Sequence, residues 1–224
     1  MTAIRQLALD LPFRAALGRE DFFVTPSNAL AVAKIDRWPR WSPPKLLITG
    51  PPGSGKTHLA AVWAQAANAS IVSALMVSEA YSDEIPRALV VEDVDRVAGN
   101  RQSEEALFHL HNAVMEGGGS LLMTGQGGLS GWGLTLPDLQ SRIAAADTAT
   151  LELPDDTLLA AVLVKLFDDR QLIVAPDLIS YLVQRIDRSF VEAETIVRKL
   201  DRAALSLRRR VTRALAVDVL RDDA

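Results

Sequence analysis

The sequence predicts an α/β domain, built on a parallel sheet that helices cover on both faces, followed by a small all-helical domain. Short apolar runs of strand length alternate with helix-length segments up to residue 153, and this order favours parallel strands joined by helical crossovers. After Leu153-Pro154 only amphipathic helical patterns remain. We therefore expect an N-terminal tail at 1–13, the α/β domain at 14–153 and a helical domain at 154–224.

Five apolar runs have the length of buried strands. They lie at 45–49, 71–74, 88–91, 120–124 and 148–153. The first run is closed by Gly-Pro-Pro-Gly, a combination that ends regular structure. These runs supply the strands of the predicted sheet.

Helical spacing and capping residues mark the remaining elements. We expect a helix at 56–67 and another that Ser103 caps, which runs through Met115 and stops at Gly117. Four helices are expected in the C-terminal domain: one at 155–168, one from Pro176, one behind Ser189 and Glu192 at capping-box spacing, and one capped by Thr212.

Composition narrows the classes of protein that remain. No apolar run approaches the roughly 20 residues that cross a bilayer, and the N-terminus lacks the pattern of a secretory signal. The absence of cysteine excludes disulfides and argues against thiolate metal sites. These features predict a cytoplasmic protein without membrane contact. The net charge of −4 argues against electrostatic binding of nucleic acid by the chain as a whole. We interpret Arg208–Arg210 with Arg213 as a basic turn rather than a binding patch.

Gly50–Thr57 matches the phosphate-binding pattern G-x-x-x-x-G-K-[ST] in full. Its glycines let successive backbone N–H groups point into one concavity, at which the next helix aims its positive end. Lys56 can reach the β- and γ-phosphates, and the Thr57 hydroxyl can bind Mg²⁺. The pattern predicts a site for ADP or ATP with Mg²⁺. Its candidate contacts are Pro52, Gly53, Ser54, Gly55, Lys56, Thr57 and His58.

Glu92 and Asp93 end a buried strand, where a phosphate-binding loop usually finds its acidic partners. We predict that Glu92 joins Thr57 at the metal and that Asp93 orients the attacking water. The alternative is a helix N-cap role for Asp93 or Asp95.

Three further patterns each allow a functional and a structural interpretation. Thr124-Gly125-Gln126 ends a strand, either as a polar sensor of the γ-phosphate or as a simple turn. Arg142, just before the last strand, is placed to act on a neighbouring subunit as an arginine finger, although an arginine there is more often a surface charge. Gln6-Leu7-Ala8-Leu9 is either a hydrophobic latch or strand, or a motif that docks in a partner's groove.

Together these motifs resemble one family, the bacterial replication initiator DnaA and its shortened relatives, the Hda proteins. Gly-Lys-Thr-His-Leu at 55–59 is the loop ending typical of that family, and Ser141-Arg142 is similar to its arginine-finger motif. The resemblance implies an AAA+ fold with a helical lid that opens near Asp187-Arg188-Ser189. It also implies that the segment Phe22 to Asn28 closes over the adenine, which makes Phe23, Val24 and Asn28 the candidate base contacts.

Two features resemble Hda rather than DnaA. The chain ends about where an AAA+ lid ends, and Gln6, Leu7 and Leu9 fit the family's clamp-binding peptide. The resemblance then implies a protein that binds the DNA-loaded sliding clamp, so that its contact with DNA is indirect. The protein, as a monomer or as a homo-oligomer, would contact ATP-bound DnaA and promote hydrolysis of the ATP that DnaA holds. The candidate catalytic residues are Glu92, Asp93 and Arg142.

The sequence also departs from the family. The order Glu92-Asp93 reverses the usual acidic pair, and Glu192 stands where DnaA proteins have a lid arginine, although Arg188 could substitute. We therefore expect a protein that holds nucleotide, with ADP favoured, and has at most weak ATPase activity of its own. The alternatives are a helicase-loader-like AAA+ protein that binds single-stranded DNA through Arg208–Arg210 and, less favoured, a small P-loop kinase.

Overall fold

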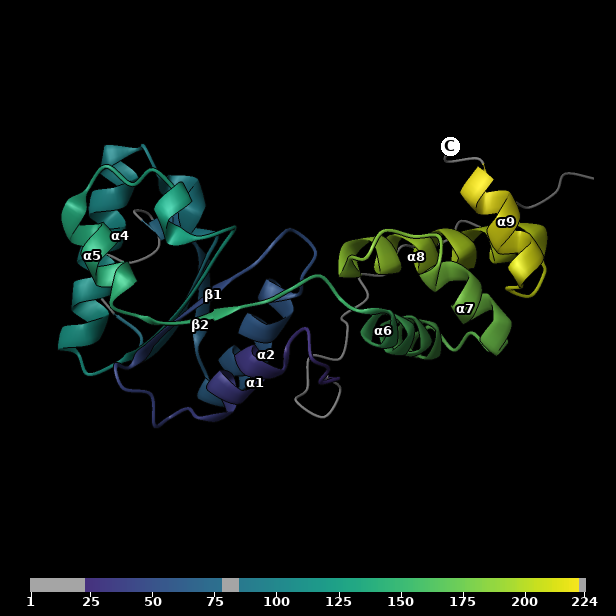
Figure 1. Ribbon diagram of the computed structural model, residues 1–224, viewed down its shortest axis with the longest axis horizontal. Helices are drawn as coiled ribbons and strands as arrows, with labels where there is room; N and C mark the ends of the chain where they lie inside the picture. Colours follow the sequence, from purple (N-terminus) through teal and green to yellow (C-terminus); the bar gives the residue numbers. More distant parts are fainter. Residues whose placement is uncertain (1–22, 78–84, 222–224) are drawn as a thin grey trace, which may run out of the picture.

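The computed structural model describes residues 23–77 and 85–221. An α/β domain and a helical domain lie next to each other along the long axis of the molecule (Figure 1). The α/β domain contains α1 (Ala29–Asp36), β1 (Lys45–Thr49), α2 (Lys56–Ala67), β2 (Ser70–Ser73), β3 (Ala88–Glu92), α4 (Arg101–Glu116), β4 (Ser120–Gly125), α5 (Pro137–Ala144) and β5 (Asp147–Thr150). Short 3-10 turns occupy Ala74–Met76, Val94–Val97 and Leu129–Gly131.

The five strands form one parallel sheet in the order β2-β3-β4-β1-β5. This confirms the predicted parallel α/β fold. Strand β4 lies between β1, which leads into the phosphate-binding loop, and β3, which ends at the acidic pair. Because parallel strands end at the same edge of a sheet, the phosphate-binding loop after β1, the acidic pair at the end of β3 and the segment Thr124-Gly125-Gln126 at the end of β4 meet at that edge.

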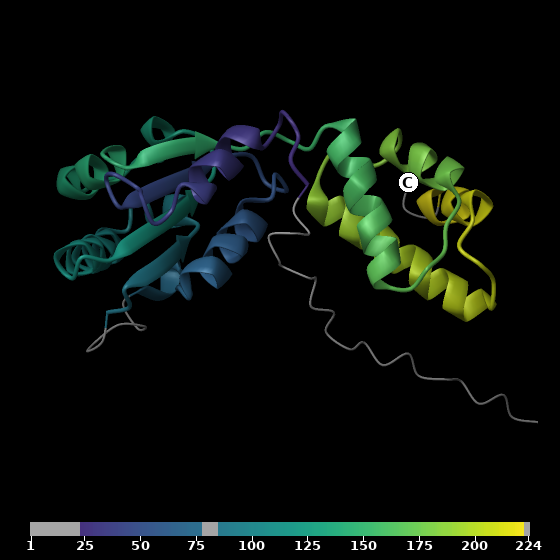
Figure 2. The same ribbon diagram turned by 90° about the horizontal axis from the view of Figure 1, so that it is seen from below.

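Successive side chains along the strands pack into two separate hydrophobic cores, one on each face of the sheet. Leu46 and Ile48 pack with α1 and α2, where Trp63 is one of the largest buried side chains. Leu47, between them, faces the opposite side and packs with α4 and α5. The domain is therefore a three-layer α/β/α sandwich, and α4 and α5 lie on the side remote from the helical domain (Figures 1 and 2).

The helical domain contains α6 (Asp156–Asp169), α7 (Pro176–Val183), α8 (Phe190–Leu207) and α9 (Arg213–Arg221). The predicted caps Ser189 and Thr212 are present, and Asp155, expected as the first residue of its helix, is a third cap. Asp155 Oδ1 accepts from the N–H of Leu158 at 2.8 Å, Ser189 Oγ from that of Glu192 at 3.1 Å, and Thr212 Oγ1 from that of Leu215 at 3.4 Å. The four helices share a core of their own, and we refer to this domain as the lid.

Some element boundaries differ from expectation. Asn100, not Ser103, caps α4, because its Oδ1 accepts from the N–H of Ser103 at 3.1 Å. Strand β5 ends at Thr150 instead of 153, since the chain then turns so that Glu152 N–H reaches the carbonyl of Ser27. Helices α1 and α5 were not anticipated. Within residues 23–77 and 85–221, none of the helices combines the length and the apolar character that a membrane crossing requires.

Candidate functional site

A cavity of about 580 Å³ lies where the phosphate-binding loop meets the lid. The sheet domain contributes Phe23, Asn28, Pro52, Gly53, Gly55, Lys56, Thr57, His58, Ala61, Asp93 and Gln126 to its wall. The lid contributes Leu158, Val162, Lys165, Leu166, Asp169, Phe190, Val191 and Glu194. The cavity therefore joins segments from both domains around the predicted phosphate site, and most of the predicted loop residues line it.

Two glycines of the loop allow the lid to approach its backbone. Gly53 and Gly55 have φ values of +74° and +93°, in the region that side chains disfavour. A Cβ on Gly53 would lie 2.6 Å from Ser189 Cβ, and one on Gly55 would lie 2.7 Å from Phe190 Cε2. The N–H of Phe190 donates to the carbonyl of Gly53 at 3.1 Å. These glycines thus serve both the curl of the loop and the contact with the lid.

Lys56, the first residue of α2, is almost fully buried at the base of the loop. Its Nζ donates to the carbonyls of Gly50 and Pro51, both at 2.8 Å. Burial lowers the pKa of Lys56, and the carboxylates of Asp93 and Asp95 oppose that shift. The Lys56 ammonium is therefore held beside the phosphate-binding loop by two neutral carbonyl oxygens. Anionic phosphate oxygens would accept more strongly from it than these carbonyls do.

The two hydroxyl side chains of the loop differ in position, because Thr57 lines the cavity and Ser54 does not. The Oγ of Ser54 is buried without a hydrogen-bond partner among the described residues. Thr57 is exposed on the cavity wall, where its hydroxyl can bind Mg²⁺. In the described ranges, no three His, Cys, Asp or Glu side chains gather closely enough to hold a metal ion by themselves. Mg²⁺ would thus need phosphate oxygens in addition to protein ligands, which is its usual mode of binding.

The acidic pair is arranged differently from the sequence prediction. Asp93 lines the cavity in a left-handed backbone conformation with φ +58°, and its N–H donates to Thr124 Oγ1 at 3.1 Å. Glu92 is not among the lining residues, and its Oε1 is buried without a hydrogen-bond partner in the described chain. The left-handed turn at Asp93 directs the second carboxylate, rather than the first, to the cavity wall. The N-cap alternative for Asp93 has no support, because its side chain caps nothing.

Thr124-Gly125-Gln126 forms a turn at the end of β4, and its possible role as a γ-phosphate sensor stays a prediction. Gln126 lines the cavity. Its N–H donates to Asp95 Oδ1 at 3.0 Å, and its carbonyl accepts from Trp132 Nε1 at 2.6 Å. The strand end is therefore a tightly bonded turn that also forms part of the cavity wall, between the loop and the acidic pair.

The predicted base contacts divide into three cases. Phe23 lines the cavity while its side chain stays 47% exposed, so a bound ring could cover it. Asn28 also lines the cavity, but its Oδ1 accepts from Thr25 N–H and its Nδ2 donates to the carbonyl of Phe23, both at 2.9 Å. Its amide group therefore organises the turn before α1. Val24 is absent from the wall and half exposed.

Sequence reasoning missed the lid wall of the cavity. The sequence predicts the helix at 155–168 but gives no indication that part of it faces a cavity. In the structure Leu159, Leu163 and Phe167 form the buried core of the lid, while Leu158, Val162 and Leu166 also line the cavity. An apolar stripe wider than one packing face needs is the signal that could have revealed this second role.

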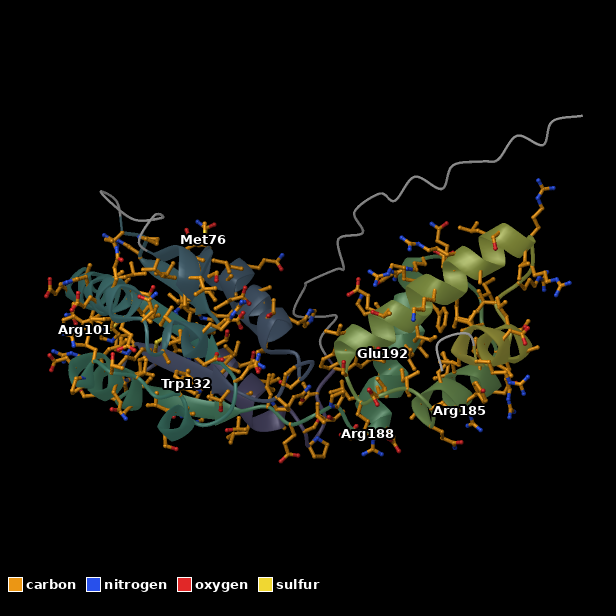
Figure 3. The ribbon with its side chains drawn as sticks, turned by 90° about the horizontal axis from the view of Figure 1, so that it is seen from above. Met76, Arg101, Trp132, Arg185, Arg188 and Glu192 are labelled. Atoms are coloured by element: carbon orange, nitrogen blue, oxygen red, sulfur yellow. The ribbon has the colours of Figure 1, made fainter. Side chains whose placement is uncertain are left out.

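No arginine lines the cavity among residues 23–77 and 85–221, and its lysines are Lys56 and Lys165. Arg188 pairs instead with Asp156 at 2.8 Å on the lid surface. Ser189 caps α8 by accepting from the N–H of Glu192, at the end of that helix facing the α/β domain (Figure 3). The N–H of Ser189 donates to the carbonyl of Asp187, so the Glu192 side chain does not complete the expected capping box. Neither Arg188 nor another arginine of the described residues therefore takes the place of the lid arginine that DnaA proteins have.

Arg142 lies far from the cavity of its own chain. It is exposed on α5, and its backbone carbonyl accepts from Nζ of Lys45 at 2.7 Å. Lys45 begins β1, whereas Gly50 follows the end of β1, so the two sites are separated by roughly 16 Å of strand. The predicted clamp-binding residues Gln6, Leu7 and Leu9 lie outside the described residues.

Comparisons with known proteins agree with this geometry. No protein-family model matches the sequence. DnaA of Thermomicrobium roseum is 27% identical over 91% of this chain, which spans about half, 49%, of that protein's length. Domain III of DnaA from Thermotoga maritima superposes with a TM-score of 0.81 at 18% identity, over 95% of this chain and 98% of that one. A DnaA solved with AMPPCP and single-stranded DNA gives 0.69 at 18% identity, over 81% and 63% of the two chains.

The parallel sheet, the phosphate-binding loop and the lid that closes on it define an AAA+ P-loop protein. Within that class, the sequence is similar to that of DnaA over 91% of this chain. The family resemblance drawn from the motifs is thereby confirmed at the level of DnaA.

Proposed function

We propose that this chain is an Hda-like regulator of replication initiation. In this account it holds an adenine nucleotide between P-loop and lid, docks on the DNA sliding clamp through Gln6, Leu7 and Leu9, and supplies Arg142 to ATP held by a DnaA molecule. The observation that carries the proposal is the position of Arg142, exposed on α5 and remote from the chain's own cradle.

The nucleotide site supports stable binding better than rapid turnover. Lys56 and the loop N–H groups would hold the β-phosphate, and Thr57 with Asp93 would share Mg²⁺ with the phosphate oxygens. Bound Mg²⁺ supplies charge neutralisation on those oxygens. The described wall offers no arginine to stabilise charge that develops on a γ-phosphate, so ADP is the favoured resident. Related DnaA structures contain AMPPCP, an ATP analogue.

Arg142 suits a role across a subunit boundary. Its side chain is exposed and forms no ion pair with another residue in the described ranges. A guanidinium that is free of internal partners can approach the γ-phosphate of a neighbouring ATP without first breaking a bond. The same geometry would serve a DnaA molecule or a second copy of this chain as the neighbour.

The test measures hydrolysis of DnaA-bound ATP in the presence of clamp loaded on DNA. The natural chain should accelerate hydrolysis, and Arg142→Ala should lose that effect while it retains nucleotide and clamp binding. Arg101→Ala is the matched control, because Arg101 is also an exposed arginine in the same helical layer and pairs with Glu105. Full stimulation by Arg142→Ala would remove this residue from the mechanism.

The clamp contact has its own test. Leu7→Ala/Leu9→Ala should abolish binding to the clamp in a pull-down, because the apolar anchors of the peptide are lost. Nucleotide affinity should not change. Clamp binding equal to that of the natural chain would refute the role of the tail.

A helicase-loader-like protein that binds single-stranded DNA directly is the second candidate. It is favoured by Arg208, Arg209 and Arg210, which are all exposed at the end of α8, and by the related DnaA solved with single-stranded DNA. Phosphate contacts of this kind weaken steeply as salt rises. Measurable binding of single-stranded DNA at low salt without the clamp, lost on substitution of the three arginines by alanine, would favour this candidate.

A further inference from the structure

Helix α5, which carries Arg142, is fixed at its N-terminal end by a buried carboxylate from α4. Glu104 has an exposed fraction of 0%. Its Oε2 accepts from the N–H groups of Thr135 at 2.9 Å and Leu136 at 2.6 Å, and from the Thr135 hydroxyl at 3.0 Å. Leu136 is the N-cap residue of α5. Glu104 Oε1 also accepts from the N–H of Gly99 at 2.8 Å.

The other end of α5 is fixed by a buried ammonium from β1. Lys45 is 7% exposed, and its Nζ donates to the Arg142 carbonyl at 2.7 Å and contacts His111 Nε2 at 3.2 Å. The last four carbonyls of a helix lack intrahelical partners. In α5 the carbonyls of Ser141 and Ile143 accept from backbone N–H groups beyond the helix, and Lys45 serves the carbonyl between them.

Both buried charges have the sign that the helix end attracts. A carboxylate is favourable at the positive N-terminal end of a helix, and a cation at its negative C-terminal end. Neither Glu104 nor Lys45 has an oppositely charged partner in the described ranges, although a buried charge is costly unless it is compensated. The backbone groups at the two ends of α5 are therefore a large part of that compensation.

The two charges differ in how far their surroundings favour the charged form. Burial, and then the charge of Arg142, lowers the pKa of Lys45. Burial raises the pKa of Glu104, but the hydrogen bonds from Thr135, Gly99 and Leu136 outweigh burial and leave it below its usual value. The carboxylate is thus ionised at neutral pH. His111 Nδ1 lies 3.3 Å from Asn112 Oδ1. A neutral His111 that donates from Nδ1 leaves Nε2 free to accept from Lys45.

We propose that Lys45 and Glu104 are positioning residues that hold α5 so that Arg142 projects in one direction toward a neighbouring nucleotide. This inference rests on the proposed function of Arg142. An arginine finger acts only from the correct geometry, and a displacement of about 1 Å can cost roughly 100-fold in rate. A short helix of eight residues could not keep that geometry by itself.

The experiment compares Lys45→Met with the natural chain in the assay of DnaA-bound ATP hydrolysis on the loaded clamp. The maximal stimulation should fall about tenfold, a modest fraction of what misplacement can cost, while the affinities for nucleotide and clamp stay unchanged. Hydrogen exchange of the α5 amides should become faster, whereas the amides of β1 and β4 should stay protected.

Lys34→Met is the matched control. Lys34 also donates to a backbone carbonyl, that of Thr148 at 2.7 Å, and pairs with Asp147. It belongs to α1, and both of these partners lie in β5 and not in α5. This variant should keep full stimulation. Glu104→Gln perturbs the other end of α5 and should reproduce the Lys45→Met result, which keeps the proposal testable if one of the two variants fails to fold.

The possible failures are distinguishable. If Arg142→Ala loses stimulation but Lys45→Met and Glu104→Gln keep it, the positioning role is wrong and the proposed function stands. If Arg142→Ala keeps stimulation, both are wrong. A loss of stimulation in Lys45→Met that comes with an equal fall in nucleotide or clamp affinity would mean that Lys45 acts through general stability, and would also overturn the positioning role.

Discussion

The backbone N–H of Phe190 donates a hydrogen bond to the carbonyl of Gly53, which ties the first residue of the long lid helix to the phosphate-binding loop. The ring of Phe190 covers Gly55 at the same place. A nucleotide held by this loop therefore contacts a surface that both domains build. Changes in the contact between loop and lid should consequently alter nucleotide affinity.

Gly55→Ala tests this coupling. The new Cβ would lie 2.7 Å from Phe190 Cε2, so the lid helix must move away from the loop, and nucleotide affinity should fall at least about tenfold. Gly99→Ala is the control, because Gly99 has a similar φ of +83° but nothing within 4 Å of the added Cβ. Both variants should lose stability through backbone strain. Equal affinity of the two variants in a calorimetric titration would contradict the coupling.

Asp93→Asn and Glu92→Gln separate the two acidic residues. Because Asp93 lines the cavity and Glu92 does not, Asp93→Asn should remove most of the Mg²⁺ dependence of nucleotide affinity. Glu92→Gln should have the smaller effect. Titrations with and without Mg²⁺ measure the difference, and the reverse order of effects would restore the assignment drawn from the sequence.

His111 predicts a dependence of stability on acid pH. Burial, followed by the charges of Lys45 and Arg142, lowers the pKa of His111 in the folded chain, although the contact with Asn112 opposes this shift. The unfolded chain therefore binds the proton first as pH falls below about 6.5. The stabilising contribution is full above that pH and is lost as pH falls toward the folded-state pKa, with a slope of at most about 1.4 kcal/mol per pH unit.

Urea unfolding at pH 7.5 and 5.5 measures this contribution. His111→Gln should lose less stability between the two pH values than the natural chain does. His109→Gln, which alters an exposed histidine on the same helix, should behave like the natural chain. An unchanged pH dependence in His111→Gln would show that other groups are responsible.

Much of the α/β domain is predictable because its signals are local. The apolar run 45–49, the loop Gly50–Thr57 and the strand end at Asp93 each carry their pattern within a few residues, and the parallel sheet follows from their alternation with helices. The caps at Asp155, Ser189 and Thr212 are local in the same sense.

The parts that could not be predicted depend on contacts distant in sequence. The bond from Lys45 to the carbonyl of Arg142 joins residues 97 positions apart, and no pattern around either residue indicates it. Asn28 has the residue type of a base contact, yet the turn next to it occupies its amide group. Whether Val162 faces a core or a cavity depends on where the lid sits, which periodicity alone does not determine.

Calorimetric titration of ADP into the natural chain and into Lys56→Ala tests the central claim most directly. With Mg²⁺ present, the natural chain should bind one ADP, and Lys56→Ala should bind it at least about a hundredfold more weakly, because it removes the cation that faces the phosphates. Thermal unfolding without nucleotide verifies that the variant is folded. No heat of binding from the natural chain at any Mg²⁺ concentration, or equal affinity in a folded Lys56→Ala, would contradict the account.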